Sequence, residues 1–274
     1  MVVQLAVGID EDTVWRTEVE PILAGIPRRA RDVWQYGFTE MMNNAIDHSS
    51  GTSVRIMITR TAVDVRIILM DDGEGIFRKI TRELQLDDER HALLELRKGK
   101  LTTDPEKHTG EGIFFTSRMF DEFNMLSDKV FFSHDSATEE DWIQEIPLND
   151  NTSGVHGTWV VLQLNNETEK TLKQVFDEYT EAGDYGFSKT VVPVRLVQYG
   201  DQALISRSQA KRLLTRFDRF KKVILDFDRV EQVGQAFADE VFRVFVRAHP
   251  DVELVPFNAN PDVGAMIRRA RNTA

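Results

Sequence analysis

The sequence predicts an α/β protein of two units, and three observations lead to this prediction. Residues 28–48 carry apolar side chains at helical spacing, and two strand-like runs follow them directly. Strand and helix patterns then alternate over roughly the last 90 residues, which is typical of a smaller α/β unit. The charge also changes sign near Asp184: residues 184–274 hold 15 basic and 11 acidic residues, a net +4, against −15 in the residues before them.

Length and composition favour a globular protein. With 274 residues, of which 41% are hydrophobic and 29% charged, the chain can form one large domain or two ordinary ones. No apolar run is long enough to span a membrane, and the first residues lack the pattern of an export signal. The absence of cysteine excludes disulfides, thiol nucleophiles and cysteine-based zinc sites. We therefore expect a cytoplasmic protein without membrane contact, and the net charge of −11 argues against direct nucleic-acid binding.

The first part of the chain contains a long polar connection and an acidic segment between its predicted helices and strands. Residues 77–109 are polar and weakly periodic, a connection long enough to be expected as a functional lid. An acidic segment, 135–153, separates two later strands. The predicted elements are, in order, a strand at 2–7, a helix at 13–23, a helix at 28–48, strands at 53–60 and 62–70, a helix at 112–123, and strands at 130–134 and 157–164.

An amphipathic helix at 168–183, ended by Gly183, is expected to connect the two units. The division is therefore predicted as a first domain over 1–167, the connector, and a second domain over 184–274. In the second domain we expect strands at 189–198, 223–227 and 252–257, and helices at 206–217 with Ser206 as N-cap, 234–249 and 261–271.

Two short strings carry the chemistry. In FTEMMNNAIDHS (38–49), Glu40, Asn44 and Asp47 lie at i, i+4 and i+7, so they share one face of a helix. DDGEGI (71–76) begins with two carboxylates and contains two glycines, which allow a tight turn and a close approach to a ligand. An acid and an amide facing such a turn suit a nucleotide with its metal.

These strings, together with G-x-G at 110–112 and Gly157-Thr158 on a strand, resemble the ATP-binding domain of the GHKL superfamily. That superfamily includes gyrase, MutL, sensor histidine kinases and anti-sigma-factor kinases. The resemblance covers residues 38–163, with the four motifs in the family's order. It implies a Bergerat-type two-layer α+β sandwich that binds ATP and Mg²⁺.

The resemblance also implies roles for the helix and lid residues. Asn44 matches the asparagine that binds Mg²⁺ between the ATP phosphates, and an amide oxygen is a suitable hard ligand. Glu40 matches the acid that activates the attacking water in hydrolysing members. Asp47 matches an acidic position of the gyrase-like branch. Gly110 and Gly112 match the lid glycines, after which a helix offers free N–H groups to the phosphates.

The remaining matches concern the adenine. Asp71 matches the aspartate that accepts a hydrogen bond from the exocyclic amine of adenine. Gly73 and Gly75 match the glycines that let the backbone pass beside the base. Thr158 matches the threonine that supports this aspartate and a bridging water.

The C-terminal part resembles the STAS-like domains of unknown function that follow GHKL domains in prokaryotes, over residues 205–245. In anti-anti-sigma STAS proteins a serine at a strand–helix junction is phosphorylated. Here that junction, residues 230–237, holds neither Ser nor Thr, so we do not expect an intramolecular serine-kinase cycle. No histidine precedes the first ATP motif, which argues against histidine autophosphorylation.

Two groups of charges have open interpretations. Those of the lid, Lys98, Lys100, Lys107 and His108, are either solvated or contacts for phosphate. A basic cluster in the second domain is either a solvated helix face or a docking surface for the acidic ATP domain or an acidic partner. Its members are Arg207, Lys211, Arg212, Arg216, Arg219, Lys221 and Lys222.

The leading hypothesis is an ATP- and Mg²⁺-binding regulatory protein with weak ATPase activity, whose ATP-ordered lid signals to a protein partner through the STAS-like domain. A serine/threonine kinase acting on a separate protein, as the anti-sigma kinases do, is the first alternative. A catalytically silent nucleotide-binding module is the second. GHKL proteins often dimerise, but the sequence shows no clear seam for a homodimer.

Overall fold

A computed structural model describes most of the chain and divides it into two compact units. The first unit comprises Met1–Leu93 and Leu101–Val175, and the second comprises Leu94–Lys100 and Phe176–Ala274. The second unit is therefore discontinuous, because a short piece of the chain leaves the first unit and then returns to it. The described residues are 1–101, 110–136, 138, 140–146, 155–180, 186–198 and 203–272.

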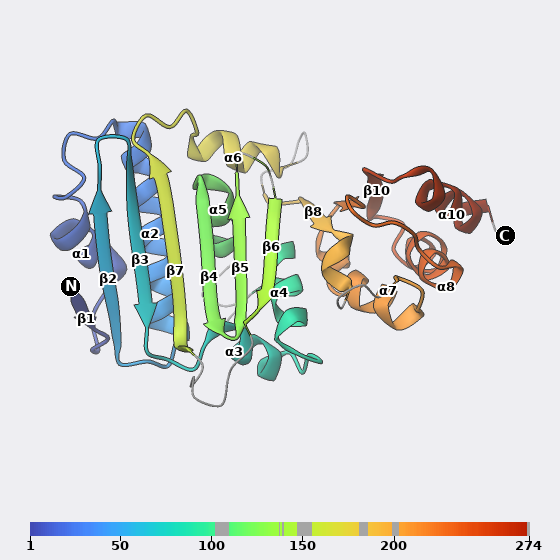
Figure 1. The fold of residues 1–274 in the computed structure, drawn as a ribbon, viewed down its shortest axis with the longest axis horizontal. Coiled ribbons are helices and arrows are strands. Elements are labelled where there is room, and N and C mark those ends of the chain that lie inside the picture. The colour runs from blue at the N-terminus through green and yellow to red at the C-terminus, as the bar shows by residue number, and fades with distance from the viewer. Residues whose placement is uncertain are drawn as a thin grey trace. The chain divides into compact units, whose positions relative to one another are not determined.

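The first unit is built on a seven-stranded antiparallel sheet, with the order β1-β2-β3-β7-β4-β5-β6 (Figure 1). Along the inner strand β3, Val65, Ile67 and Leu69 are buried, whereas Arg66 between the first two is exposed. This alternation buries one face of the sheet and fixes its register. The strands are β1 Val2–Gln4, β2 Ser53–Arg60, β3 Asp64–Asp71, β4 Glu122–Asp128, β5 Val130–Asp135, β6 Glu140–Glu145 and β7 Val155–Asn165.

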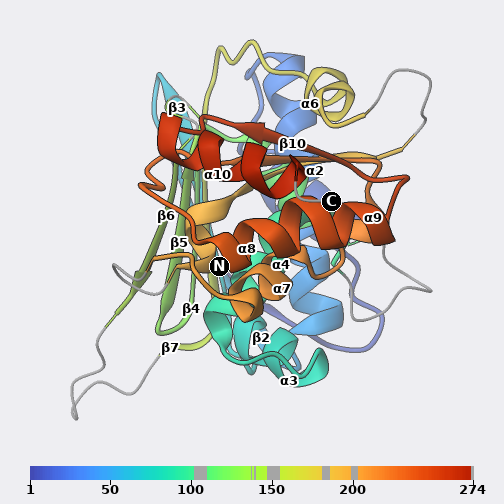
Figure 2. The same cartoon turned by 90° about the vertical axis from the view of Figure 1, so that its right-hand side faces the viewer.

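Helices cover that buried face, with α2 and α5 behind the strands in Figure 1 and to one side of them in Figure 2. The two helices pack closely because Gly37 has no side chain: an added Cβ would lie 2.2 Å from the ring of Phe120. Trp34 meets the same ring edge-on at 4.7 Å between centroids. The helices are α1 Glu11–Val14, which continues as a π-helical turn, α2 Arg28–His48, α3 Ile76–Glu83, α4 Glu89–Lys98, α5 Gly112–Met119 and α6 Leu172–Glu178.

The second unit has a three-stranded parallel sheet in the order β10-β9-β8, with helices following the strands. Ser206 caps α7 as expected, and a capping box forms because Gln209 Oε1 accepts a hydrogen bond from the Ser206 N–H. Its elements are β8 Lys189–Pro193, α7 Arg207–Leu214, β9 Lys222–Asp226, α8 Gln235–Asp239, which continues through a π-helical turn into α9 Val246–Ala248, β10 Glu253–Phe257 and α10 Pro261–Asn272.

The mixed α/β fold class is confirmed, and so are most elements, but four expectations need correction. The supposed lid contains two helices, α3 and α4. The helix at 112–123 ends at Met119, and β4 begins at Glu122. The acidic segment contains strand β6. The strand at 189–198 ends at Pro193, where a 3-10 turn begins. Gly183 and much of the acidic segment lie outside the described residues.

In the part of the chain that the structure describes, no helix combines the length and the apolar run needed to cross a bilayer.

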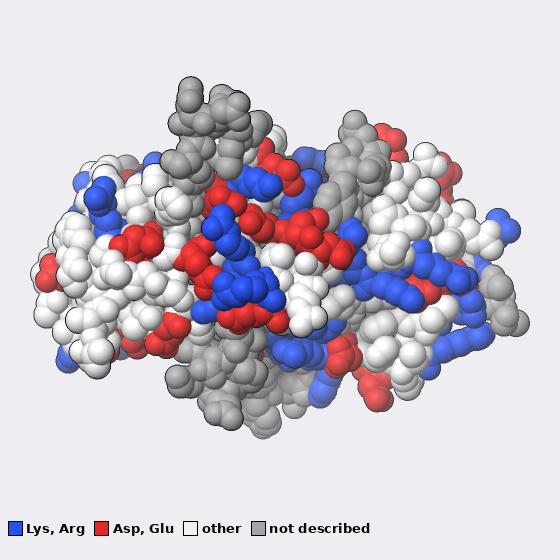
Figure 3. Space-filling view, turned by 90° about the horizontal axis from the view of Figure 1, so that it is seen from below, with Lys and Arg blue, Asp and Glu red and all other residues white. Residues whose placement is uncertain are grey.

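On the face drawn in Figure 3, basic side chains gather over the second unit with acidic ones among them.

Candidate functional site

Helix α2 carries the first group of predicted site residues. Its apolar face, including Trp34, Phe38 and Met42, is buried against the sheet and sets the rotation of the helix. Glu40 and Asn44 are consequently half-buried, one turn apart on the same stripe, whereas Asp47 is exposed. The sequence thus places the two main candidates together at the margin of the core.

Asn44 shows an unusual feature for a partly buried amide. Its Nδ2 atom is buried and has no hydrogen-bond partner among the described residues. A buried donor without a partner costs about 1–3 kcal/mol, so such groups generally mark a ligand or water site. The residue therefore fits a role in binding a polar ligand.

Glu40 lies against the first turn of α5. A Cβ added to Gly112 would lie only 1.9 Å from Glu40 Oε2, so the carboxylate occupies the space that the glycine leaves. Tyr36, one turn before Glu40, has a raised pKa because it is buried and because the negative charges of Glu40 and Glu111 are close to it. Helix α2 and the Gly110–Gly112 motif thus meet at the carboxylate of Glu40.

The N-terminus of α5 lacks a side-chain cap. Its N-cap residue, Glu111, makes no side-chain capping hydrogen bond. The first N–H groups of a helix need external partners and attract anions, so this end suits a phosphate.

Gly110, two residues before the first residue of α5, lies against the backbone of Leu101. The N–H of Leu101 donates to the carbonyl of Gly110 at 3.1 Å. Gly110 has a φ of +73°, and a Cβ there would lie 2.3 Å from the carbonyl carbon of Leu101, so only glycine fits this close approach. Lys107 and His108 of the predicted lid lie outside the described residues.

The Asp71 turn is fixed to the C-terminal end of α2. The N–H of Glu74 donates to the Ser49 carbonyl at 3.0 Å, and Lys79 Nζ donates to the His48 carbonyl at 2.8 Å. A Cβ on Gly73 would lie 2.1 Å from the same Ser49 oxygen, so a side chain at this position would push the turn away from the helix. One helix therefore positions both predicted motifs.

Asp71 itself is buried, and burial raises the pKa of its carboxyl. Hydrogen bonds from the backbone N–H groups of Gly73 and Thr158 act in the opposite direction, the first at 2.9 Å. Gly157 makes this pairing possible: its φ is +83°, and a Cβ there would lie 2.0 Å from the Asp71 carbonyl oxygen. The structure thus brings Asp71 and the Gly157-Thr158 pair together, as the sequence predicts.

The Thr158 side chain supports the same turn from its far end. Its Oγ1 accepts a hydrogen bond at 3.0 Å from the N–H of Ile76, the first residue of α3. Gly75, just before it, has a φ of +90°, and a Cβ there would lie 2.6 Å from Ser127 Oγ. Gly73 and Gly75 are therefore both required, because the backbone at each position comes too close to other atoms for a side chain to fit.

Sequence reasoning gave no role to Asp72. Its carboxylate accepts four hydrogen bonds, from the backbone N–H and the hydroxyl of both Thr52 and Ser53, at 2.7–2.9 Å. These bonds hold the pKa of Asp72 well below its usual range. The Thr-Ser pair that starts β2 was the available signal, because hydroxyl residues and free backbone N–H groups at a strand start are typical partners of a carboxylate.

Two of the lid lysines, Lys98 and Lys100, make contacts that the sequence did not predict. Lys98 is fully buried and donates to Glu95, so it is neither solvated nor a phosphate contact. Lys100 donates to the carbonyl of Arg219 at 2.9 Å. Both lysines belong to the second unit.

Comparison with known families agrees with this geometry. Residues 11–130 match the histidine kinase-like ATPase domains. Residues 209–264 match a STAS-like domain of unknown function. The chain thus carries a histidine kinase-like ATPase domain over residues 11–130. A STAS-like domain follows it in the same chain.

Among solved structures, the chain is similar to the ATP-binding domain of topoisomerase IV from Francisella tularensis in complex with a small molecule inhibitor. The identity is 11%, the match covers 65% of this chain and 83% of that chain, and the TM-score is 0.30. At these values the likeness carries no functional argument. No curated protein matches the chain.

Proposed function

We propose that this protein is an ATP- and Mg²⁺-binding regulatory protein of the cytoplasm with weak ATPase activity, which acts on a protein partner. The observation that carries the proposal is the contact of Glu40 with Gly112 at the start of α5, with the buried amide of Asn44 one turn further along the same face of α2. The family of the domain supports the same ligand.

The residues fit the nucleotide and its metal. Asn44 would supply an oxygen ligand to Mg²⁺, and the phosphates with water would supply the rest. The N–H groups at the start of α5 would bind the phosphates, and Asp71 would accept a hydrogen bond from the adenine amine. Bound Mg²⁺ would contribute charge neutralisation on the phosphates.

Glu40 would act as the general base. Its carboxylate lies at the helix end where we place the phosphates, so it is suited to orient a water for attack and to accept its proton. Weak turnover suits a switch, since the ATP-bound state must persist long enough to signal.

The test is to measure Mg²⁺-ATP binding and turnover in the wild type, Glu40→Gln, Asn44→Ala and the control Asn43→Ala, which alters the neighbouring amide outside the stripe. We expect Glu40→Gln to bind ATP and to lose roughly a hundredfold or more of turnover, the scale of general-base loss. Asn44→Ala should lose the Mg²⁺ dependence of binding, and Asn43→Ala should resemble the wild type.

The outcomes separate the alternatives. No binding of Mg²⁺-ATP by the wild type would refute the proposal, and normal turnover in Glu40→Gln would refute only the base. Transfer of radiolabel from ATP to a second protein would identify a kinase. Tightly bound ADP without turnover would identify a silent binding module.

A further inference from the structure

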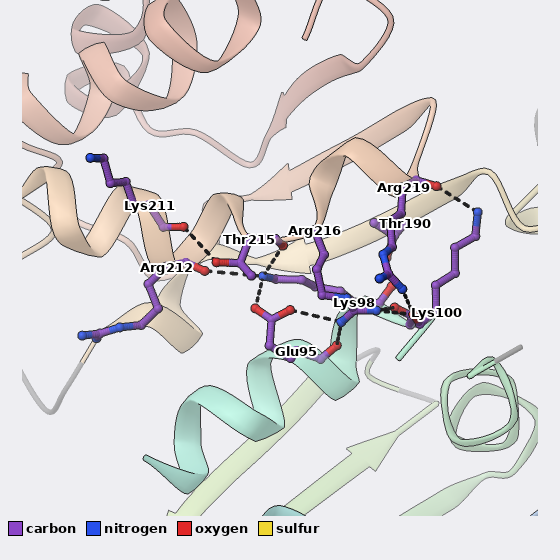
Figure 4. Close-up of polar contacts among 10 residues, drawn as sticks. Glu95, Lys98, Lys100, Thr190, Lys211, Arg212, Thr215, Arg216 and Arg219 are labelled. Carbon is purple, nitrogen blue, oxygen red and sulfur yellow. Dashed lines mark hydrogen bonds and ion pairs between the residues drawn. The ribbon is translucent and has the colours of Figure 1, made fainter. Parts of the chain in front are cut away.

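A cluster of three buried charges joins a seven-residue piece of the chain to the STAS-like domain. We call this piece, Leu94–Lys100, the anchor segment; it belongs to the second unit although its neighbours in sequence belong to the first. Glu95 and Lys98, one turn apart on α4, have no exposed surface and pair with each other. Arg216 of the STAS-like domain donates to Glu95 Oε2 at 3.1 Å (Figure 4).

The backbone carbonyls at the end of α4 are also bound by the STAS-like domain. The last carbonyls of a helix have no partner inside it, and here side chains supply them. Arg216 Nη2 donates to the Gly99 carbonyl at 3.0 Å, and Thr190 Oγ1 donates to the Lys98 carbonyl at 2.8 Å. In return, Lys98 Nζ donates to the Thr215 carbonyl at 2.9 Å. The helix end is thus capped from outside, with cations in the favourable place.

Lys100 fixes the exit of the segment. Its ammonium lies over the rings of Phe220 and Phe187, at 5.0 and 5.6 Å from their centroids. Arg219 Nη1 donates to the backbone carbonyl of Lys100 at 3.1 Å. Gly99 and Lys100 both have positive φ, +83° and +53°, and such a conformation at a lysine costs about 1 kcal/mol or more unless the surroundings hold it.

The cluster is better suited to fixing position than to adding stability. Burial lowers the pKa of Lys98 to about 8, and Glu95 only partly opposes this effect. Burial likewise lowers the pKa of Arg216. Buried ion pairs are often no more stable than apolar residues of the same size, and their best-attested use is to specify register.

The chain runs directly from the anchor segment to the candidate site. Lys100 is followed by Leu101, whose N–H donates to the Gly110 carbonyl at 3.1 Å. Two residues after Gly110, Gly112 packs against the carboxylate of Glu40. One peptide bond and one hydrogen bond therefore connect the segment to Gly110, two residues before the start of α5.

We propose that the anchor segment couples the STAS-like domain to the ATP site: partner binding at the STAS-like domain shifts Leu94–Lys100 and so moves Gly110–Gly112 relative to Glu40. This inference rests on the proposed function for its ligand. Coupling is reciprocal, so nucleotide binding also changes the STAS-like domain, and the usual range of such effects is about 5- to 150-fold in affinity.

The test compares Arg216→Met, which removes the guanidinium, with Arg243→Met as control. Arg243 is an arginine of the same unit whose guanidinium pairs with Asp239, one turn before it in the chain. Amide hydrogen exchange without nucleotide is followed at Leu101 and residues 110–115, and the affinity for a non-hydrolysable ATP analogue with Mg²⁺ is measured. We expect faster exchange and an affinity changed about fivefold or more in Arg216→Met alone.

The coupling would be overturned if Arg216→Met folds, exchanges at Leu101 at the wild-type rate and binds the analogue within about twofold of the wild-type affinity. Allosteric effects on affinity are usually about fivefold or larger. If Arg216→Met does not fold, Thr190→Val, which removes one bond to Lys98, replaces it with the same criterion at Leu101. If the wild type binds no ATP analogue, the proposed function fails. The exchange measurement then still decides whether Arg216 affects the amide protection of Gly110–Gly112.

Discussion

Asp71 and Asp72 are neighbours at the end of β3, yet their carboxyl groups have opposite surroundings. Successive strand residues point to opposite faces, so Asp71 enters the core and Asp72 faces the loop that starts β2. Burial raises the pKa of Asp71, whereas hydrogen bonds from Ser53 and Thr52 lower that of Asp72. One carboxylate is available to recognise a ligand, and the other holds the turn in place.

The raised pKa of Asp71 predicts how nucleotide binding depends on pH. An ionised carboxylate accepts the hydrogen bond from the adenine amine more strongly than a protonated one, and the raised pKa means that Asp71 becomes protonated at a higher pH than an exposed aspartate would. Affinity should therefore be full above the raised pKa and fall as pH decreases through it. The measurement is ATP-analogue affinity against pH in the wild type and in Asp71→Asn, since their ratio removes the ionisation of the phosphates.

We expect Asp71→Asn to bind about tenfold more weakly at neutral pH, the equivalent of one charged hydrogen bond. The ratio of affinities should approach one in acid. A ratio that stays constant over the whole pH range would show that Asp71 does not bind the base as an anion.

At the scale of elements, the contact between α2 and α5 can be tested at Gly112. A Cβ there would lie 1.9 Å from Glu40 Oε2, but the carboxylate ends a flexible side chain and can move. Alanine is also favoured over glycine in a helix by up to about 1 kcal/mol. We therefore expect Gly112→Ala to fold with an unchanged or higher melting temperature, and to lose roughly a hundredfold of ATP turnover because the base is displaced.

Gly73→Ala is the matched comparison. Its added Cβ would lie 2.1 Å from the Ser49 carbonyl oxygen, which is backbone and cannot move independently. This variant should lose stability by about 1–3 kcal/mol, as overpacked sites do. Full turnover in Gly112→Ala would contradict the position assigned to the base.

Sequence periodicity predicted the helices and strands that have one apolar, buried face. It missed those elements whose buried side chains are charged and pair with residues far away in the chain. Helix α2 and strands β2 and β3 have strong periodicity and were predicted closely. Helix α4 carries Glu95 and Lys98 on its buried side, where Arg216, 121 residues away in the chain, pairs with Glu95. Sequence reasoning therefore read this region as an exposed lid.

The same reason limits what could be predicted of the site. Asp71, Gly73 and Thr158 could be recognised because they match short motifs of a known family, and the structure brings the three residues to one turn. Their roles toward ATP, like those of Glu40 and Asn44, stay predictions. The domain boundaries at 167 and 183 also stay predictions, and no local pattern indicates that Leu94–Lys100 packs with residues that follow Val175.

At the scale of the whole molecule, α4 is shared between the two units. Its residues up to Leu93 belong to the first unit, and those from Leu94 belong to the second. A helix propagates cooperatively, so loss of order in one half weakens the other. The units should therefore unfold together although their sheets are separate.

Two spectroscopic probes can test this coupling, because all four tryptophans lie in the first unit, at Trp15, Trp34, Trp142 and Trp159. Their fluorescence follows the first unit alone, whereas far-ultraviolet circular dichroism follows both units. We expect coincident denaturant transitions in the wild type, the usual sign of a single cooperative event.

In Arg216→Met, Glu95 loses its hydrogen bond to the guanidinium and keeps the one to Lys98, and the carbonyls of Gly99 and Lys100 each lose one hydrogen bond. The dichroism transition should then begin at lower denaturant than the fluorescence transition, and Arg243→Met should keep both together. Separate transitions in the wild type, or coincident ones in a folded Arg216→Met protein, would show that the anchor segment does not join the stability of the two units.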